Sequence, residues 1–157
     1  MEGGCACGEI RYRLESRPLF IHCCHCRSCQ RETGTAFALN ALIETSRVRL
    51  LQGTPHTVHT PSDSGKGQDI VRCPVCQVAI WSHYAGAGSA IAFVRVGTLD
   101  EASGFEPDIH IYTASKQEWV LIPEDQPAVA QYYSPKDFWP AESLARWQAL
   151  RQGTASD

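Results

Sequence analysis

Residues 5–14 read CACGEIRYRL, and they combine two signals that recur along the chain. The first is a pair of cysteines separated by one residue. The second is an alternation in which Ile10, Tyr12 and Leu14 are apolar while the residues between them are polar. Side chains two positions apart on a strand point to the same face, so this alternation is typical of a strand with one buried face. The stretch therefore predicts a β-strand that begins beside a cluster of thiols.

Strand patterns dominate the rest of the chain. Short apolar or alternating runs, separated by Gly, Pro, Asp or Ser, predict a series of short strands. These runs lie at residues 10–14, 19–23, 37–43, 48–51, 70–72, 78–83, 91–96, 109–113 and 119–122. Residues 60–67 are rich in Ser, Gly and Asp and predict an exposed loop. Short strands at such spacing favour a mainly β fold of packed antiparallel sheets.

Helical signals gather at the end of the chain. Residues 141–152 repeat apolar side chains at every third position, and Ser134-Pro135 is a typical helix start. The sequence therefore predicts a C-terminal helical tail over about residues 134–153 that covers the sheet. A short helical turn is expected at residues 30–32. We expect residues 1–157 to form a single domain, because chains of about this length usually do.

Composition excludes several classes of protein. The chain has 157 residues, of which 43% are hydrophobic and 20% charged, and this is enough apolar material for a core. No apolar run approaches the roughly 20 residues that cross a bilayer, so we expect no membrane partner. The net charge of −3 disfavours a nucleic-acid partner. The first residues lack the pattern of a secretory signal, and a cytoplasmic location is expected.

The cysteine content is the most informative feature. The chain has eight cysteines. Structural disulfides are rare in the reducing cytosol, so this number favours metal binding.

One set of four cysteines predicts a structural zinc site. Cys5 and Cys7 share a strand face, and Cys73 and Cys76 form a C-x-x-C turn between two predicted strands. Four thiolates arranged tetrahedrally close a zinc site, which then contributes folding energy and no chemistry.

A second set predicts an open site. Cys24 and Cys26 share a face, and Cys29 follows three residues later. Adjacent strand residues point to opposite faces, so Cys23 is expected to be buried elsewhere and His25 to point away from this set. Three protein ligands leave one tetrahedral position free, as in catalytic zinc sites. Zinc binds sulfur readily and deprotonates a coordinating thiol, so such a site suits a thiol substrate held as a thiolate.

Three other interpretations of these cysteines stay open at this point. Cys26 and Cys29 with Cys73 and Cys76 would make a single zinc ribbon. The cysteines at residues 24–29 would form a second structural zinc site if His25 or another histidine supplied the fourth ligand. An open three-cysteine site with Glu32 nearby would suit activation of water, as in some deaminases.

The combined motifs resemble a known family. The quoted stretches are GGCACGEIRY at residues 3–12, CHCRSCQR at residues 24–31 followed by Thr33-Gly34, CPVC at residues 73–76, and His110-Ile111-Tyr112. Together they resemble the glutathione-dependent formaldehyde-activating enzyme family over roughly residues 3–122, and this family also includes centromere protein V.

The resemblance implies a fold, two zinc ions and a reaction. The fold would be of the Mss4-like or β-tent type. The structural zinc ligands would be Cys5, Cys7, Cys73 and Cys76, and the catalytic zinc ligands would be Cys24, Cys26 and Cys29. The family reaction adds glutathione to formaldehyde to give S-hydroxymethylglutathione, a carbon–sulfur lyase reaction written in reverse. The partners would be a small thiol and a small aldehyde. The alternative is a non-catalytic, zinc-stabilised binding module of the same fold.

Two further expectations concern single positions. Gln30, Arg31, Thr33 and Gly34 directly follow the open cysteine set and are predicted to contact the substrate, with the Arg31 guanidinium suited to a carboxylate. The family usually has glycine after its C-x-x-C pair, where this chain has Gln77. We therefore expect a differently shaped turn there.

Overall fold

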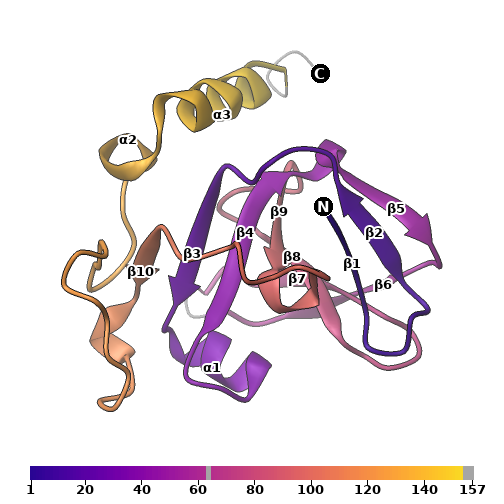
Figure 1. The fold of residues 1–157 in the computed structure, drawn as a ribbon, viewed down its shortest axis with the longest axis horizontal. Helices are drawn as coiled ribbons and strands as arrows, with labels where there is room; N and C mark the ends of the chain where they lie inside the picture. Colours follow the sequence, from indigo (N-terminus) through magenta and orange to yellow (C-terminus); the bar gives the residue numbers. More distant parts are fainter. Residues whose placement is uncertain (63–64, 154–157) are drawn as a thin grey trace.

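The computed structural model describes residues 1–62 and 65–153, and within them the chain forms ten strands in two sheets (Figure 1). The smaller sheet has the order β1-β2-β5, with bounds β1 Glu2–Gly4, β2 Arg11–Leu14 and β5 Val48–Gln52. The larger sheet has the order β10-β3-β4-β9-β8-β7-β6. Its strands are β3 Phe20–Cys24, β4 Ala38–Glu44, β6 His56–Thr60, β7 Gln68–Arg72, β8 Ala79–Tyr84, β9 Ile91–Arg95 and β10 Ile109–Ile111.

Helices are short and peripheral. They are α1 Arg27–Thr33, α2 Pro135–Phe138, α3 Ala141–Gly153, η1 Thr45–Arg47, η2 Val96–Thr98 and η3 Thr113–Ser115. The predicted mainly β architecture is thus confirmed, with one parallel pair, β10 with β3, in the larger sheet. None of the described helices combines the length and apolar character that crossing a membrane requires.

The alternation at residues 10–14 buries one face of β2 as predicted. Tyr12 and Leu14 are almost fully buried, while Arg13 between them is exposed. The Tyr12 ring packs edge-on against Trp81 of the larger sheet, with ring centroids 5.9 Å apart. This contact joins the two sheets through a shared core, which holds the N-terminal strands in place beside the cysteines.

Strand β3 is central to the site. It pairs with β10 on one side and β4 on the other, and four of its five residues are buried. Because neighbouring side chains on a strand point to opposite faces, Cys23 and Cys24 leave β3 in opposite directions. The strand thus delivers Cys24 to one side of the sheet and Cys23 to the other.

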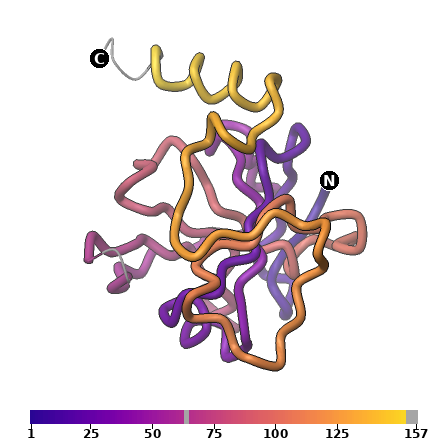
Figure 2. Tube along the Cα trace, turned by 90° about the vertical axis from the view of Figure 1, so that its left-hand side faces the viewer, coloured from indigo at the N-terminus to yellow at the C-terminus, as the bar shows by residue number. Residues whose placement is uncertain are grey.

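The C-terminal tail is two helices where the sequence predicted one helical stretch. Helix α2 ends at Phe138 and α3 begins at Ala141, with Pro140 between them. Proline has no N–H and disfavours the helical conformation in the residue before it, so it divides the tail. The Ser143 hydroxyl donates to the Leu19 carbonyl (2.6 Å), which holds α3 across one end of the larger sheet (Figure 2).

One predicted strand is absent, and two observed strands were not predicted. Residues 119–122 form no strand: Val120 is buried, but Trp119 is 73% and Leu121 88% exposed, so only part of this apolar run faces the core. Strands β1 and β6 were missed. Two of the three β1 residues are glycine, and β6 has mostly exposed His and Thr side chains, so neither shows a hydrophobic pattern. Thr60 at the end of β6 also falls in the predicted loop of residues 60–67, of which 63–64 lie outside the described residues.

A bidentate ion pair fixes α3 to the sheet and makes stability depend on pH. Arg146 donates to both carboxylate oxygens of buried Glu44, at 2.9 and 2.5 Å. Burial acts to raise the pKa of Glu44, but the Arg146 hydrogen bonds and nearby positive charge outweigh it, and the pKa lies below its usual value. A lowered folded-state pKa stabilises the fold above the unfolded pKa of about 4.3, and this contribution is lost as the pH falls below it.

We therefore expect Glu44→Gln to lower the free energy of unfolding by about 1–3 kcal/mol at neutral pH, the usual range for a hydrogen bond to a charged group. Urea unfolding measured from pH 7 to pH 3 checks this. The difference between variant and wild type should shrink below about pH 4. The exposed Glu124 provides the control, since Glu124→Gln should change stability by less than about 0.5 kcal/mol. A constant difference across this pH range would contradict the assigned role of Glu44.

Candidate metal centres

Four cysteines from two distant segments meet at one point. Cys5 lies just after β1, in the turn where its sulfur accepts the Ile10 backbone N–H (3.2 Å). Cys73 lies just after β7, and its sulfur accepts the backbone N–H of Cys76 (3.5 Å) in a tight turn. The Cys7 sulfur lies 3.5 Å from that of Cys5 and 3.7 Å from that of Cys73. All four sulfurs lie within 4.8 Å of one another.

These distances fit a closed zinc site. Four sulfurs about 2.3 Å from a tetrahedral ion lie roughly 3.8 Å apart, close to the separations found here. All eight cysteines of the chain are free thiols, so the four sulfurs are available as ligands. The group could therefore hold a metal ion, as the sequence predicted.

The turn after the C-x-x-C pair keeps its left-handed shape without glycine. Gln77 has φ 62°, so the expected change of shape is not observed. The Gln77 backbone N–H donates to the Cys73 carbonyl (3.1 Å) and the side-chain amide donates to the Pro74 carbonyl (2.9 Å). Hydrogen bonds of the turn itself thus hold a non-glycine residue in a conformation that costs about 1–2 kcal/mol.

Relieving that cost should stabilise the protein. We expect Gln77→Gly to raise the free energy of unfolding by about 0.5–1 kcal/mol, because the strain relieved exceeds the entropy that glycine adds to the unfolded chain. Thermal or urea unfolding of the zinc-loaded protein measures it. Gln77→Ala keeps the left-handed strain and loses the amide contact with Pro74, so it should be no more stable than wild type. A destabilised glycine variant would show that the side-chain contact outweighs the strain.

A second cluster gathers three sulfurs where β3 passes into α1. Cys24 is the last residue of β3, Cys26 caps the N-terminus of α1, and Cys29 lies in the first turn of that helix. The Cys29 backbone N–H donates to the Cys26 sulfur (3.4 Å). All three residues are buried, and their sulfurs lie within 4.8 Å of one another. Across residues 1–62 and 65–153, no fourth His, Cys, Asp or Glu side chain joins this trio.

The protons of the trio are unevenly distributed. Hydrogen bonds from the Cys24 and Cys26 thiols lower the pKa of Cys29 to about 3. Hydrogen bonds with Cys26 and Cys29, together with burial, raise the pKa of Cys24. The Tyr84 hydroxyl lies 3.9 Å from the Cys29 sulfur. Burial of the Tyr84 hydroxyl raises its pKa well above the usual value. Tyr84 therefore stays protonated and presents a hydrogen-bond donor beside the sulfurs.

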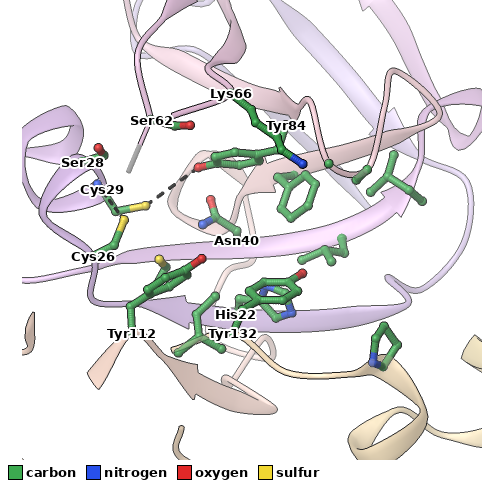
Figure 3. A pocket seen from close by; sticks show the side chains of 18 of the residues that line it. His22, Cys26, Ser28, Cys29, Asn40, Ser62, Lys66, Tyr84, Tyr112 and Tyr132 are labelled. Atoms are coloured by element: carbon green, nitrogen blue, oxygen red, sulfur yellow. Dashed lines mark hydrogen bonds between the residues drawn. The ribbon is translucent and has the colours of Figure 1, made fainter. Parts of the chain in front are cut away.

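A cavity of about 330 Å³ opens beside the trio. Figure 3 shows the Cys26 and Cys29 sulfurs on its wall, with the Tyr84, Tyr112 and Tyr132 rings around the same space. The cavity is lined by residues from β3, α1, β4, β8, β9, β10 and the C-terminal helices. Cys24, Cys26 and Cys29 all line this cavity, so a ligand in it would lie beside the three sulfurs that would hold a metal ion.

A third buried group lies on the opposite side of β3. Here Cys23 is buried as predicted, and its sulfur lies 3.6 Å from His25 Nε2. His25 Nε2 lies 2.9 Å from His110 Nδ1, and His110 Nε2 lies 2.7 Å from the Gln126 amide oxygen. The amide oxygen only accepts, so His110 Nε2 donates to it. Burial lowers the pKa of His25 to about 4, so its ring is neutral.

These placements decide between the interpretations of the cysteines. Cys26 and Cys29 cluster apart from Cys73 and Cys76, so the single-ribbon interpretation is wrong. His25 groups with Cys23 and His110, so it does not close the trio. Glu32 forms an ion pair with Arg72 and does not line the cavity, which leaves it without the position that water activation needs. Alternation along β3 predicted where His25 points, but no sequence signal linked it to His110.

The four predicted substrate residues do not line the cavity. Gln30 is buried, and its amide donates to the His25 carbonyl (2.7 Å) and the Ser115 carbonyl (2.9 Å). Arg31, Thr33 and Gly34 are exposed along the outer end of α1, where Gly34 is its left-handed cap. Their contact with substrate stays a prediction.

Comparison with known proteins identifies the family. A family model described as glutathione-dependent formaldehyde-activating enzyme matches residues 1–115, which is more than half of the chain. The chain belongs to the glutathione-dependent formaldehyde-activating enzyme family. The resemblance inferred from the motifs is thereby confirmed. The match spans both cysteine clusters and all ten strands, and it leaves α2 and α3 outside.

Two individual proteins are similar to this member of the family. A Halomonas elongata protein provisionally named glutathione-dependent formaldehyde-activating enzyme is 26% identical over 157 residues, covering 95% of this chain and 94% of that protein. A crystal structure of a Rhodobacter sphaeroides protein is similar with a TM-score of 0.49 and 19% identity, covering 64% of this chain and 89% of that one.

Proposed function

We propose that this protein is a zinc-dependent enzyme that adds a small thiol, such as glutathione, to a small aldehyde, such as formaldehyde. In the direction of bond cleavage this is a carbon–sulfur lyase reaction. The observation that carries the proposal is a three-sulfur cluster without a fourth protein ligand among the described residues, set in the wall of a cavity. A binding module without chemistry needs neither the free ligand position nor the adjoining cavity.

The residues divide into two roles. Cys5, Cys7, Cys73 and Cys76 would hold a structural zinc ion that joins the N-terminal strands to the end of β7. Cys24, Cys26 and Cys29 would hold the second ion. When bound there, zinc supplies the positive charge that keeps a substrate thiol ionised at neutral pH.

The protein groups around the second site would direct the addition. The cavity admits the substrate and aims it at the trio. The protonated Tyr84 hydroxyl, 3.9 Å from Cys29, is placed to donate to oxygen as negative charge develops on the aldehyde. Arg31, exposed on α1, is proposed as a contact for a substrate carboxylate outside the cavity. Eight free thiols suit a reducing compartment, which supports a cytoplasmic location.

The test measures adduct formation against its spontaneous background. Glutathione and formaldehyde are mixed with zinc-loaded protein, with chelated protein and with no protein, and S-hydroxymethylglutathione is followed by NMR exchange spectroscopy. We expect faster exchange with the zinc-loaded protein alone, restored when zinc is returned to the chelated sample. Equal exchange in all samples, repeated with other thiol and aldehyde pairs, would reject the enzymatic role.

A further inference from the structure

The walls of the cavity beside the trio are mainly apolar. Six aromatic side chains line it: Tyr84, Phe93, Tyr112, Tyr132, Trp139 and Trp147. Leu42, Ile91 and Ile111 add aliphatic surface. Among the described residues that line it there is one lysine, Lys66, and no Asp, Glu or Arg.

The cavity extends along β3 away from the sulfurs. Residues 20, 22 and 24 lie on one face of β3, and the four residue steps from 20 to 24 span about 13 Å. Cys24 and His22 both line the cavity, and Trp139, another lining residue, stacks on Phe20 at the start of the strand (ring centroids 5.6 Å apart). The space therefore reaches from the reacting position to the apolar cover that the C-terminal tail provides.

Neither substrate named by the family explains such a cavity. Formaldehyde has a single carbon and needs no apolar surface. Glutathione carries two carboxylates and an ammonium group, and each charge that enters an apolar cavity without a partner loses its hydration at a large cost. By contrast, an apolar cavity of about 150 Å³ is enough to hold benzene. A cavity of about 330 Å³ has room for a ring and a short chain.

We propose that this cavity binds an uncharged apolar group of the substrate, the size of an aromatic ring with a short chain, carried on either the aldehyde or the thiol. The proposal rests on the proposed function for the position of the reacting sulfur. In the reaction a bond forms between the thiolate sulfur and the carbonyl carbon. The carbonyl π bond breaks, its electron pair goes to oxygen, and that oxygen takes the proton that the thiol released.

Binding tests the proposal without requiring turnover. Zinc-loaded protein is titrated with phenylmethanethiol, 2-hydroxyethanethiol and glutathione, and binding is followed by calorimetry and by tryptophan fluorescence, since Trp139 and Trp147 line the cavity. Phenylacetaldehyde is titrated as the apolar aldehyde. Burial of a phenyl group predicts that phenylmethanethiol binds about 10- to 100-fold more tightly than 2-hydroxyethanethiol. Equal affinities for the two thiols, with no binding of phenylacetaldehyde, would overturn the proposal.

Turnover then shows which substrate carries the apolar group. Each of glutathione and phenylmethanethiol is paired with each of formaldehyde and phenylacetaldehyde. A preference for phenylacetaldehyde with glutathione places the group on the aldehyde, and a preference for phenylmethanethiol with formaldehyde places it on the thiol. Fastest turnover with glutathione and formaldehyde would reject the apolar substrate while leaving the proposed function standing. Absence of turnover with every pair would reject the proposed function. The binding result would still show whether the cavity holds an apolar group.

A variant whose new side chain fills the cavity tests whether the apolar group binds there. Gly86 lines it, and a Cβ added there meets no atom within 4 Å. Gly86→Phe should therefore fold, keep its zinc and weaken phenylmethanethiol binding about tenfold or more, with 2-hydroxyethanethiol unaffected. Gly104 has equal space for a Cβ but does not line the cavity, so Gly104→Phe should leave both affinities unchanged. Unchanged phenylmethanethiol binding in Gly86→Phe would mean that the apolar group binds elsewhere.

Discussion

Cys73→Ala is expected to bind one zinc ion fewer than wild type and to lose its native fold. Cys73 is fully buried in the core that joins the two sheets, and its sulfur accepts two backbone N–H groups of its turn. Structural zinc contributes about 10–16 kcal/mol in small zinc domains, whereas whole domains are stable by only about 5–15 kcal/mol. Losing a ligand from the saturated site therefore removes a contribution comparable to the entire stability.

Zinc content by mass spectrometry under native conditions, together with circular dichroism, measures both parts of this prediction. Cys23→Ala is the matched control, because Cys23 is equally buried but belongs to neither proposed zinc site. It removes a buried sulfur and should cost about 1–3 kcal/mol without changing the zinc content. A folded Cys73→Ala protein that retains two zinc ions would contradict the structural role of the site.

The two cysteine clusters are predictable from sequence because most of their members lie close together in the chain. Cys5 and Cys7 are one residue apart and lie in the turn after β1, where the sequence predicted a strand, and a tight turn places Cys73 with Cys76. Alternation along a strand also predicts that Cys23 and Cys24 point to opposite faces, as they do on β3. The contact between residues 5–7 and residues 73–76 required an assumption about the tertiary fold. That assumption came from the four ligands that a closed zinc site needs.

The cavity could not be predicted from short-range geometry along the chain. Its walls come from segments that are far apart in the sequence, including Asn40, Tyr84, Tyr112 and Trp139. No local pattern at Asn40, Tyr84 or Trp139 marks a cavity, and the motif that contains Tyr112 does not indicate that its side chain lies near the trio. Sequence proximity to the trio instead pointed to Gln30 and its neighbours, but α1 turns these residues away from the cavity. Proximity along a chain is a poor guide once a helix begins, because successive side chains then point around its axis.

The buried pair of His25 and His110 shows the same limit. His110 pairs in parallel with Cys23 across β10 and β3, two strands separated by most of the chain. A parallel neighbour needs a long crossover, so its register depends on everything that folds between the strands. No pattern in either segment contains that information.

Cys26→Ala should have the opposite outcome to Cys73→Ala: it loses one zinc ion, abolishes thiol addition and stays folded. Cys26 lies at the start of a seven-residue helix on the edge of the cavity, and the trio joins only residues 24–29. Since the open site closes no long loop of the chain, its ion contributes little to folding. The main cost is the lost cap on α1, about 1 kcal/mol.

Cys26→Ser distinguishes the role of Cys26 as the N-terminal cap of α1 from its role as a proposed zinc ligand. A serine hydroxyl still accepts the Cys29 N–H, so the stability of Cys26→Ser should be nearly that of wild type. A hydroxyl is a poor zinc ligand beside a thiolate, so both variants should retain one zinc ion and bind no phenylmethanethiol through its sulfur. If Cys26→Ala and Cys73→Ala each lost the same single ion, the division into a closed and an open site would fail. If Cys26→Ala unfolded while Cys26→Ser kept both ions, the trio would have to be a structural element.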